Sequence, residues 1–215
     1  LYTGEHMFDF ESIPTLEGKV AIVTGANTGL GYYTSLALVR RGATVILGCR
    51  SSKKCNKAAS DIAKNVSSST GDYASPSSAG LAIPMIVDLS SLASVRTFYE
   101  TFATNFGGDG LDILILNAGF ISKGYSETTD GIESQWQVNH VGHHYLYNLL
   151  EDSLLVAAKR AGHATVTAVS SAANYEISTV PFSLKDINVA EGYVPFTRYC
   201  ETKLANILCH IIILV

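Results

Sequence analysis

Cysteine is scarce in this sequence, and the signals that cysteine usually carries are missing with it. The four cysteines among 215 residues form no CxxC pair and no spacing typical of zinc ligands. They are also too few for a disulfide scaffold. We therefore interpret Cys49, Cys55, Cys200 and Cys209 as reduced thiols in an intracellular protein, which we place in the cytoplasm, with association with an organelle membrane left open.

Charge and long apolar runs are lacking as well. Charged residues make up 16% of the chain, and the formal net charge is −4 without a long block of one sign, so we expect no nucleic-acid partner. Apolar stretches near the N-terminus are short and broken by charge, and no signal peptide or transmembrane helix can be drawn there. The run at 211–215 has only five residues and cannot span a bilayer.

What the sequence does contain is an alternation of short β-branched runs with helical patterns. With 47% hydrophobic residues, the chain can bury one sizeable core. We expect strands at 19–24, 43–48, 81–87, 111–116 and 164–169, and helices at 32–41, 52–65, 92–106, about 131–160 and from Thr197 on. This order predicts a single α/β domain, a doubly wound parallel sheet with a ligand crevice at the carboxyl ends of its strands.

Finer expectations accompany this fold. The strands at 111–116 and 164–169 are apolar enough to be buried on both faces. Ser51 or Ser52 caps the second helix, and residues 66–80 form a surface loop. Residues 1–18 form an N-terminal extension to a domain at 19–215.

A glycine-rich turn follows the first strand, where TGANTGLG at 24–31 opens a helix. Glycines let the backbone approach a pyrophosphate, and the free N–H groups at a helix start favour its charge. The spacing is GxxxGxG rather than GxGxxG, so glycines that serve only tight packing are an open alternative. We expect the cofactor to contact Gly25, Asn27, Thr28, Gly29, Leu30 and Gly31.

The end of the second strand bears on which dinucleotide binds. An acidic residue there would bond the ribose 2′-hydroxyl of NAD. The sequence instead has Gly48-Cys49-Arg50, with Lys53 and Lys54 beyond. An arginine suits the extra phosphate of NADP. The residues therefore favour NADP(H) over NAD(H), unless these three cations only form a solvated surface.

Tyr199 and Lys203 lie four residues apart, on one face of the last expected helix. A tyrosine titrates at about 10, so it is a poor acid or base at neutral pH unless a positive charge stabilises its phenolate. Lys203 can supply that charge. The same spacing also occurs in ordinary amphipathic helices.

Several polar residues stand at the carboxyl ends of strands or inside a helix. Ser170 and Ser171 follow the strand at 164–169, where a hydroxyl could bond a substrate oxygen or simply turn the chain. Asn139 occupies a helix interior, where asparagine is unfavourable. Its neighbours His140, His143 and His144 could suggest a metal, but no carboxylate or cysteine has matching spacing and we expect none.

Taken in order, these segments resemble the short-chain dehydrogenase/reductase family. The resemblance is carried by TGANTGLG at 24–31, Asp88-Leu89, LNAG at 116–119, Asn139, Ser171 and Tyr199-xxx-Lys203. Within the family, CR at 49–50, VNHVGHHYL at 138–146 and YCETKLANIL at 199–208 are similar to the branch of retinol dehydrogenases and WW-domain oxidoreductases. The resemblance covers nearly the whole chain from Lys19 on and implies a Rossmann fold.

The resemblance also implies roles for single residues. Tyr199 would be the general acid/base, Ser171 would polarise the carbonyl, and Asn139 would order a relay water. Lys203 would lower the pKa of the tyrosine and hold the nicotinamide ribose. Asp88 would contact adenine, Leu89 would also bind the cofactor, and Asn117, Ala118 and Gly119 would shape the cofactor site. Two departures, Leu116 where a second asparagine is common and Thr202 where serine is common, are expected to be mild.

The implied function is an NADP(H)-dependent oxidoreductase acting on a carbonyl or alcohol, with a retinoid, steroid, lipid aldehyde or xenobiotic substrate. A non-catalytic dinucleotide-binding or scaffold protein and an inactive fragment are the alternatives. The family's fold continues beyond the Tyr-Lys helix, whereas this chain stops twelve residues after Lys203, and its first methionine is Met7. We therefore expect a C-terminally truncated copy.

The last helix also carries an apolar stripe, formed by Leu204, Ile207, Leu208, Ile211 and Ile212. In the family that the sequence resembles, this helix packs on the sheet and often against a partner subunit, so the resemblance implies a homo-oligomer for the complete protein. Without later strands the sheet would end at an uncovered edge, so the 215-residue chain alone should express poorly or self-associate.

Overall fold

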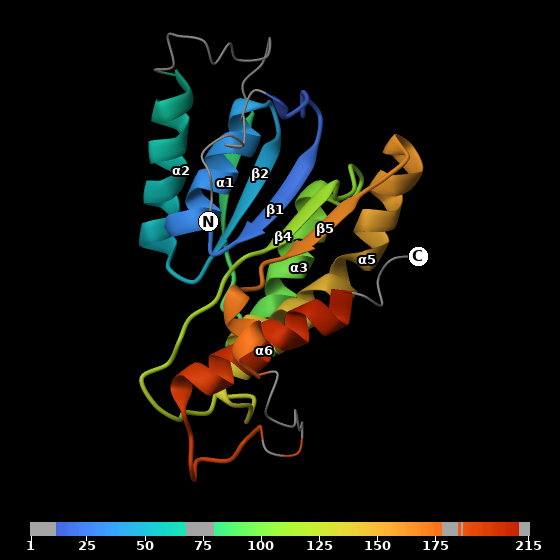
Figure 1. The fold of residues 1–215 in the computed structure, drawn as a ribbon. Coiled ribbons are helices and arrows are strands. Elements are labelled where there is room, and N and C mark those ends of the chain that lie inside the picture. The colour runs from blue at the N-terminus through green and yellow to red at the C-terminus, as the bar shows by residue number, and fades with distance from the viewer. Residues whose placement is uncertain (1–11, 68–79, 178–184, 186, 211–215) are drawn as a thin grey trace.

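The computed structural model describes residues 12–67, 80–177, 185 and 187–210. Its centre is a parallel sheet in the order β3-β2-β1-β4-β5 (Figure 1). The strands are β1 (Val20–Thr24), β2 (Thr44–Cys49), β3 (Leu81–Ile86), β4 (Ile113–Leu116) and β5 (Thr165–Ala168). This order and the parallel pairing confirm the doubly wound α/β prediction.

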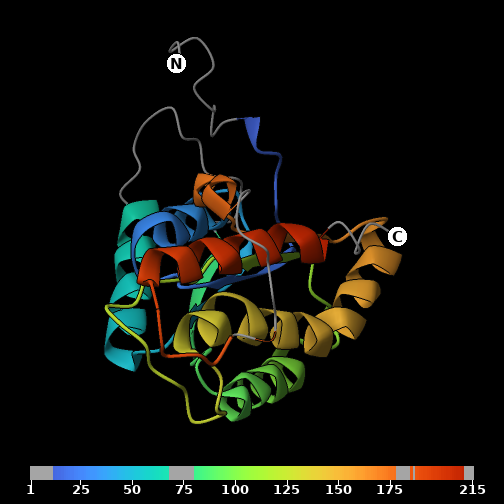
Figure 2. The ribbon, with the colours of Figure 1, turned by 60° about the horizontal axis from the view of Figure 1, so that its bottom comes forward.

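Helices cover both faces of the sheet. They are α1 (Gly29–Arg40), α2 (Ser52–Ser67), α3 (Leu92–Phe106), α4 (Ser134–Trp136), the π-helical turn η2 (Gln137–Val141), α5 (Gly142–Ala161), the 3-10 turn η3 (Ala172–Ile177) and α6 (Pro195–His210). Successive side chains of a strand point to opposite faces. Ile22 accordingly packs in a core with α3 and α5, while Val23 packs in a second core with α1 and α2. The helices of both layers are seen from another side in Figure 2.

Most expected elements are present, with two differences of substance. The helix expected at about 131–160 is broken into α4, η2 and α5. The strand expected at 164–169 is not buried, since Thr165 and Thr167 of β5 are exposed. Among the described residues β5 pairs with β4 alone, and an edge strand is less covered than a central one.

Two smaller expectations concern segments between elements. Ser51 caps α2, because its Oγ accepts a hydrogen bond from the backbone N–H of Lys54 at 3.5 Å. Most of the loop expected at 66–80 lies outside the described residues, as do Ile211 and Ile212 of the apolar stripe. Of the rest of that stripe, Ile207 and Leu208 are exposed. In the part of the chain that the structure describes, no helix is long and apolar enough to cross a membrane.

An ion-pair cluster holds the amino-terminal edge of the sheet together. Asp112, which is 3% exposed, accepts hydrogen bonds from the backbone N–H of Val20 at 2.9 Å, from Lys19 Nζ at 2.9 Å and from Arg160 Nη2 at 2.7 Å. Burial alone would raise the pKa of the Asp112 carboxyl, but these donors outweigh it and lower that pKa. The cluster therefore ties the start of β1 to the last turn of α5.

The prediction of four reduced thiols is wrong for one pair. Cys49, at the end of β2, and Cys55, in the first turn of α2, form a disulfide with Cα atoms 5.8 Å apart. The turn from strand to helix brings together two residues that are six apart in sequence, a separation that no CxxC rule detects. Cys200 and Cys209 are free. The intracellular location rested on free thiols, and it stays a prediction that this disulfide does not support.

Candidate active site

A cleft of about 610 Å³ opens at the carboxyl ends of the strands. Its lining contains ten of the residues predicted to contact a cofactor, namely Gly25, Asn27, Thr28, Leu30, Arg50, Asp88, Leu89, Asn117, Ala118 and Gly119. Gly29, Gly31, Tyr199 and Lys203, also predicted, are not among the lining residues. Ser51, Phe120 and Val138 line the cleft but were not predicted from the sequence.

The glycine turn between β1 and α1 forms one wall of this cleft. Gly25 and Gly29 have φ values of 67° and 56°, which an L side chain rarely adopts. At Gly31 a Cβ would lie 2.5 Å from the carbonyl oxygen of Gly25 and 2.5 Å from Nδ2 of Asn117. Gly31 therefore allows the helix to start close against the turn, where its free N–H groups can meet an anion.

Thr24 joins this wall to the turn after β4. Its Oγ1 accepts hydrogen bonds from the backbone N–H groups of Asn117 and Ala118 at 2.9 and 3.0 Å, and its carbonyl accepts one from Asn117 Nδ2 at 2.8 Å. His143 Nε2 lies 2.8 Å from the same Oγ1. Thr24 is thus a positioning residue that the sequence analysis missed, because its partners lie more than 90 residues away.

The end of β2 supplies the cationic side of the cleft. Arg50 and Lys54 line it together with Ser51. Asp88 is the acidic residue in the lining, and its Oδ1 already accepts hydrogen bonds from the backbone N–H and the hydroxyl of Ser90, at 3.0 and 2.6 Å. Arg50 is exposed, so its guanidinium is open to an anionic ligand.

Asn139 is fully buried in the π-helical turn η2. Its amide pairs with the backbone of Phe120 in both directions at 3.0 Å, and its Nδ2 also donates to Thr202 Oγ1 at 3.2 Å. The structure therefore explains the asparagine in a helix interior: it joins the turn after β4 to α6. Its backbone carbonyl accepts a hydrogen bond from Asn206 Nδ2 at 3.3 Å.

Lys203 extends from α6 toward Asn139 and Gly119. Its side chain is buried, and Nζ donates to the carbonyl of Val169 at 2.8 Å and lies 5.6 Å from the centre of the Tyr199 ring. Burial lowers the pKa of the Lys203 ammonium. A Cβ placed on Gly119 would lie 3.4 Å from Lys203 Nζ and 3.3 Å from Asn139 Oδ1. Gly119 therefore marks the point where the cleft meets these two side chains.

The two serines after β5 have different partners. Ser170 Oγ donates to the carbonyl of Lys203 at 2.8 Å, so its hydroxyl helps to hold α6. Ser171 Oγ accepts a hydrogen bond from the backbone N–H of Ala173 at 3.2 Å, at the start of η3, which packs against α6. That bond uses a lone pair of Ser171 Oγ and leaves its hydrogen available to a substrate.

The three histidines near Asn139 have separate partners. His140 Nδ1 lies 2.8 Å from Asn206 Oδ1, and His144 Nδ1 lies 3.3 Å from Cys209 Sγ. His143 contacts Thr24, as described above. Within the described ranges, no three side chains of the metal-ligating types form a group that could hold a metal ion.

Comparisons with known proteins agree with this geometry. A family model described as short chain dehydrogenase matches residues 19–182. Human retinol dehydrogenase 12 is 39% identical over 193 residues, covering 90% of this chain and 55% of the relative. The WW domain-containing oxidoreductase of Gallus gallus is 37% identical over 199 residues, covering 90% of this chain and 44% of the relative.

Among solved structures, an uncharacterized protein from Mycobacterium Paratuberculosis is similar with a TM-score of 0.72 and 34% identity, over 94% of this chain and 63% of that one. The chain thus spans about half the length of the curated relatives it matches. The matched family model covers most of the chain and includes the glycine turn, Asn139 and Ser171. The chain belongs to the short-chain dehydrogenase family.

Proposed function

We propose that the protein is an NADP(H)-dependent oxidoreductase that interconverts a carbonyl and an alcohol. The observation that carries the proposal is the meeting at Gly119 of the glycine-walled cleft with Asn139 and Lys203. A cofactor site and an acid/base group must adjoin for hydride and proton to reach one substrate. A protein that only bound a dinucleotide would need the cleft but not this junction.

The residues of the cleft fit a phosphorylated dinucleotide. A Cβ on Gly25 or Gly31 would press against Asn117, so the turn at the start of α1 is kept free of side chains and its N–H groups could meet a pyrophosphate. Arg50 and Lys54 stand where the adenosine ribose would end, without an acid on the same strand end. This charge favours the additional phosphate of NADP(H), and the bound dinucleotide would supply or accept the hydride.

Proton transfer is assigned to Tyr199. In carbonyl reduction its hydroxyl gives a proton to the substrate oxygen, which becomes an alcohol, and in alcohol oxidation the proton returns. The Lys203 ammonium, 5.6 Å from the ring centre, stabilises the phenolate. Ser171 donates its hydroxyl hydrogen to the substrate oxygen, and the Asn139 segment orders a relay water. These roles stay proposals that mutation can test.

The substrate class follows from the relatives. Human retinol dehydrogenase 12 is one of them, and its name supports an apolar primary alcohol or its aldehyde, a retinoid or lipid aldehyde, as the substrate. A steroid or xenobiotic carbonyl would be the alternative within the same chemistry. We also propose that the complete protein is a homo-oligomer, in which the exposed Ile207 and Leu208 of α6 would be covered.

Oxidation of NADPH by the complete protein, in the presence of retinaldehyde, straight-chain aldehydes and ketosteroids, tests this function. Turnover of a carbonyl with NADPH is expected. NADPH binding without turnover of any of these substrates would instead indicate a non-catalytic cofactor-binding protein, and no NADPH binding would reject the cofactor site itself.

A further inference from the structure

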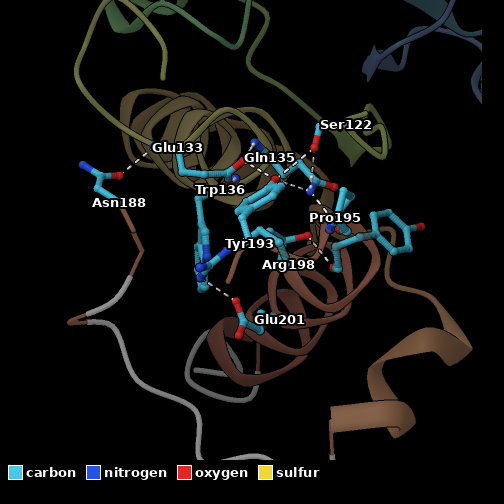
Figure 3. A network of polar contacts seen from close by, with 11 residues as sticks. Ser122, Glu133, Gln135, Trp136, Asn188, Tyr193, Pro195, Arg198 and Glu201 are labelled. Atoms are coloured by element: carbon cyan, nitrogen blue, oxygen red, sulfur yellow. Dashed lines mark hydrogen bonds and ion pairs between the residues drawn. The ribbon is translucent and has the colours of Figure 1, made fainter. Parts of the chain in front are cut away.

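A network of polar contacts joins the start of α4 to the first turn of α6 (Figure 3), and none of its residues lines the cleft. We call it the Glu133 network and define it by Ser122, Glu133, Gln135, Tyr193 and the carbonyl of Pro195. These residues come from the segment after β4, the start of α4, and the loop leading into α6. The network therefore joins three parts of the chain that the sheet does not connect.

Glu133 is a carboxylate with no exposed surface. It caps α4, because Oε1 accepts a hydrogen bond from the backbone N–H of Gln135 at 3.0 Å and Oε2 accepts one from that of Trp136 at 2.9 Å. The helix start also favours a negative charge. A buried carboxyl group is tolerated when such donors surround it, so these hydrogen bonds hold the Glu133 side chain in place.

The hydroxyl of Tyr193 determines which groups of the network donate hydrogen bonds and which accept them. Its hydroxyl donates to Glu133 Oε1 at 2.8 Å, and a carboxylate can only accept. The single hydrogen of the phenol is therefore used, and Ser122 Oγ, 2.9 Å away, and Gln135 Nε2, 2.8 Å away, must donate to the Tyr193 oxygen. Burial raises the pKa of Tyr193, which keeps the phenol protonated as this arrangement requires.

Gln135 carries the network into α6. Besides contacting Tyr193, its Nε2 lies 2.9 Å from the carbonyl oxygen of Pro195, the first residue of α6. In an α-helix that carbonyl accepts the N–H of the residue four positions on, which is Tyr199. Gln135 is fully buried, so a displaced side chain would leave the Tyr193 oxygen and the Pro195 carbonyl without this donor. The turn that presents Tyr199 is thus anchored to α4.

The helix α4, which contains Gln135, continues directly into η2, which contains Asn139. We propose that Glu133, Gln135 and Tyr193 are positioning residues, which fix the first turn of α6 against α4 and thereby place Tyr199 relative to Asn139 for proton transfer. The proposal rests on the proposed function for the identity of the reaction. Its structural content, the anchoring of α6, does not depend on turnover.

The test is Tyr193→Phe in the complete protein, which removes one hydroxyl and keeps the ring. The matched control is Tyr125→Phe, since the Tyr125 ring packs edge-on against that of Tyr193, with centres 5.5 Å apart, while its hydroxyl bonds to Glu127 outside the network. Three quantities are measured for each protein: kcat at saturating NADPH, the Kd for NADPH, and hydrogen–deuterium exchange of backbone amides.

For Tyr193→Phe, kcat should fall about ten- to a hundredfold, the scale of a misplacement of about 1 Å, while the Kd for NADPH stays close to that of the parent. Exchange should speed up in the first turns of α4 and α6 and stay unchanged in α1 and α2. Tyr125→Phe should match the parent in all three. Ser122→Ala, a milder change, should shift the same quantities in the same direction and keeps the test open if Tyr193→Phe does not fold.

Two outcomes would overturn the proposal. The first is a Tyr193→Phe protein with parental kcat and parental exchange in α6. The second is faster exchange in all the helices that cover the sheet, with kcat unchanged. The network would then contribute to global stability only. If the parent itself turns over no carbonyl, the proposed function fails, and exchange in α6 still decides whether the network anchors that helix.

Discussion

Lys203 Nζ lies 5.6 Å from the centre of the Tyr199 ring while it donates a hydrogen bond to the carbonyl of Val169. The lysine is therefore held by the end of β5 and not by solvent. Because burial lowers its pKa, the folded protein binds this proton less tightly than the unfolded chain does. The group to which we assign a role in proton transfer is thus kept at a cost in stability.

The lowered pKa of Lys203 predicts that the free energy of unfolding depends on pH. Between the lowered pKa of folded Lys203 and the ordinary value of 10.5, the unfolded chain holds more protons, so the free energy of unfolding should rise with pH in that window. Lys203→Met lacks the titrating group and should lack this part of the slope, while losing both turnover and NADPH affinity. Urea unfolding of both proteins from pH 7 to 10 measures the slope. Parallel curves would contradict the prediction.

Cofactor choice should depend on Arg50. NADPH is expected to bind more tightly than NADH, and Arg50→Ala should remove most of the difference, on the order of 1 to 3 kcal/mol for hydrogen bonds to a charged group. Lys53→Ala is the matched control, because it removes a neighbouring positive charge that does not line the cleft. Fluorescence titration with both dinucleotides checks this. Equal NADPH and NADH affinities in the parent would reject it.

Alanine substitutions at two glycines of the turn should destabilise the protein for different reasons. Gly31→Ala places a Cβ 2.5 Å from the Gly25 carbonyl, so the wall of the cleft must shift, at a cost of about 1 to 3 kcal/mol and with weakened NADPH binding. Gly29→Ala meets no atom within 4 Å and should suffer mainly from its positive φ, at about 1 kcal/mol. Thermal melts with and without NADPH separate the two. A Gly31→Ala protein that binds NADPH normally would show that the close contact is unimportant.

The Asp112 cluster should stabilise the fold in a pH-dependent way. Asp112 has a pKa below its ordinary 3.8, so its contribution is present above pH 3.8 and lost as pH falls through the lowered folded value. Asp112→Asn should cost on the order of 2 kcal/mol at pH 7, and the gap to the parent should close below pH 3.8. Asp61→Asn, in an exposed pair with Lys57, is the control and should change little. A constant gap down to pH 2 would contradict the account.

The structure could be predicted best where it depends on residues that are close together in the sequence. The strand, glycine turn and helix at 19–40 follow from local patterns, and so does the placement of Tyr199 and Lys203 on one helix face. Those elements were predicted with bounds close to the ones observed. The lining of the cleft by Arg50 followed in the same way, from its place at the end of β2.

Contacts between residues far apart in the sequence could not be predicted from it. Thr24 meets Asn117 across 93 residues, and Tyr193 meets Glu133 across 60, separations at which no spacing rule operates. The break of the expected helix at η2 lies where Asn139 bonds to Phe120 and Thr202, contacts that a helical pattern does not reveal. The exposure of β5 likewise depends on which strand stands beside it.

Proton transfer by Tyr199 next to an NADP(H) site is tested most directly by one comparison. The parent protein and Tyr199→Phe, both complete, are assayed with NADPH and a panel of aldehydes, and their NADPH affinities are measured in parallel. The substitution removes the proton donor and keeps the ring, so turnover should fall by about a hundredfold or more while NADPH affinity stays nearly intact. Near-parental turnover by Tyr199→Phe would contradict the assigned mechanism.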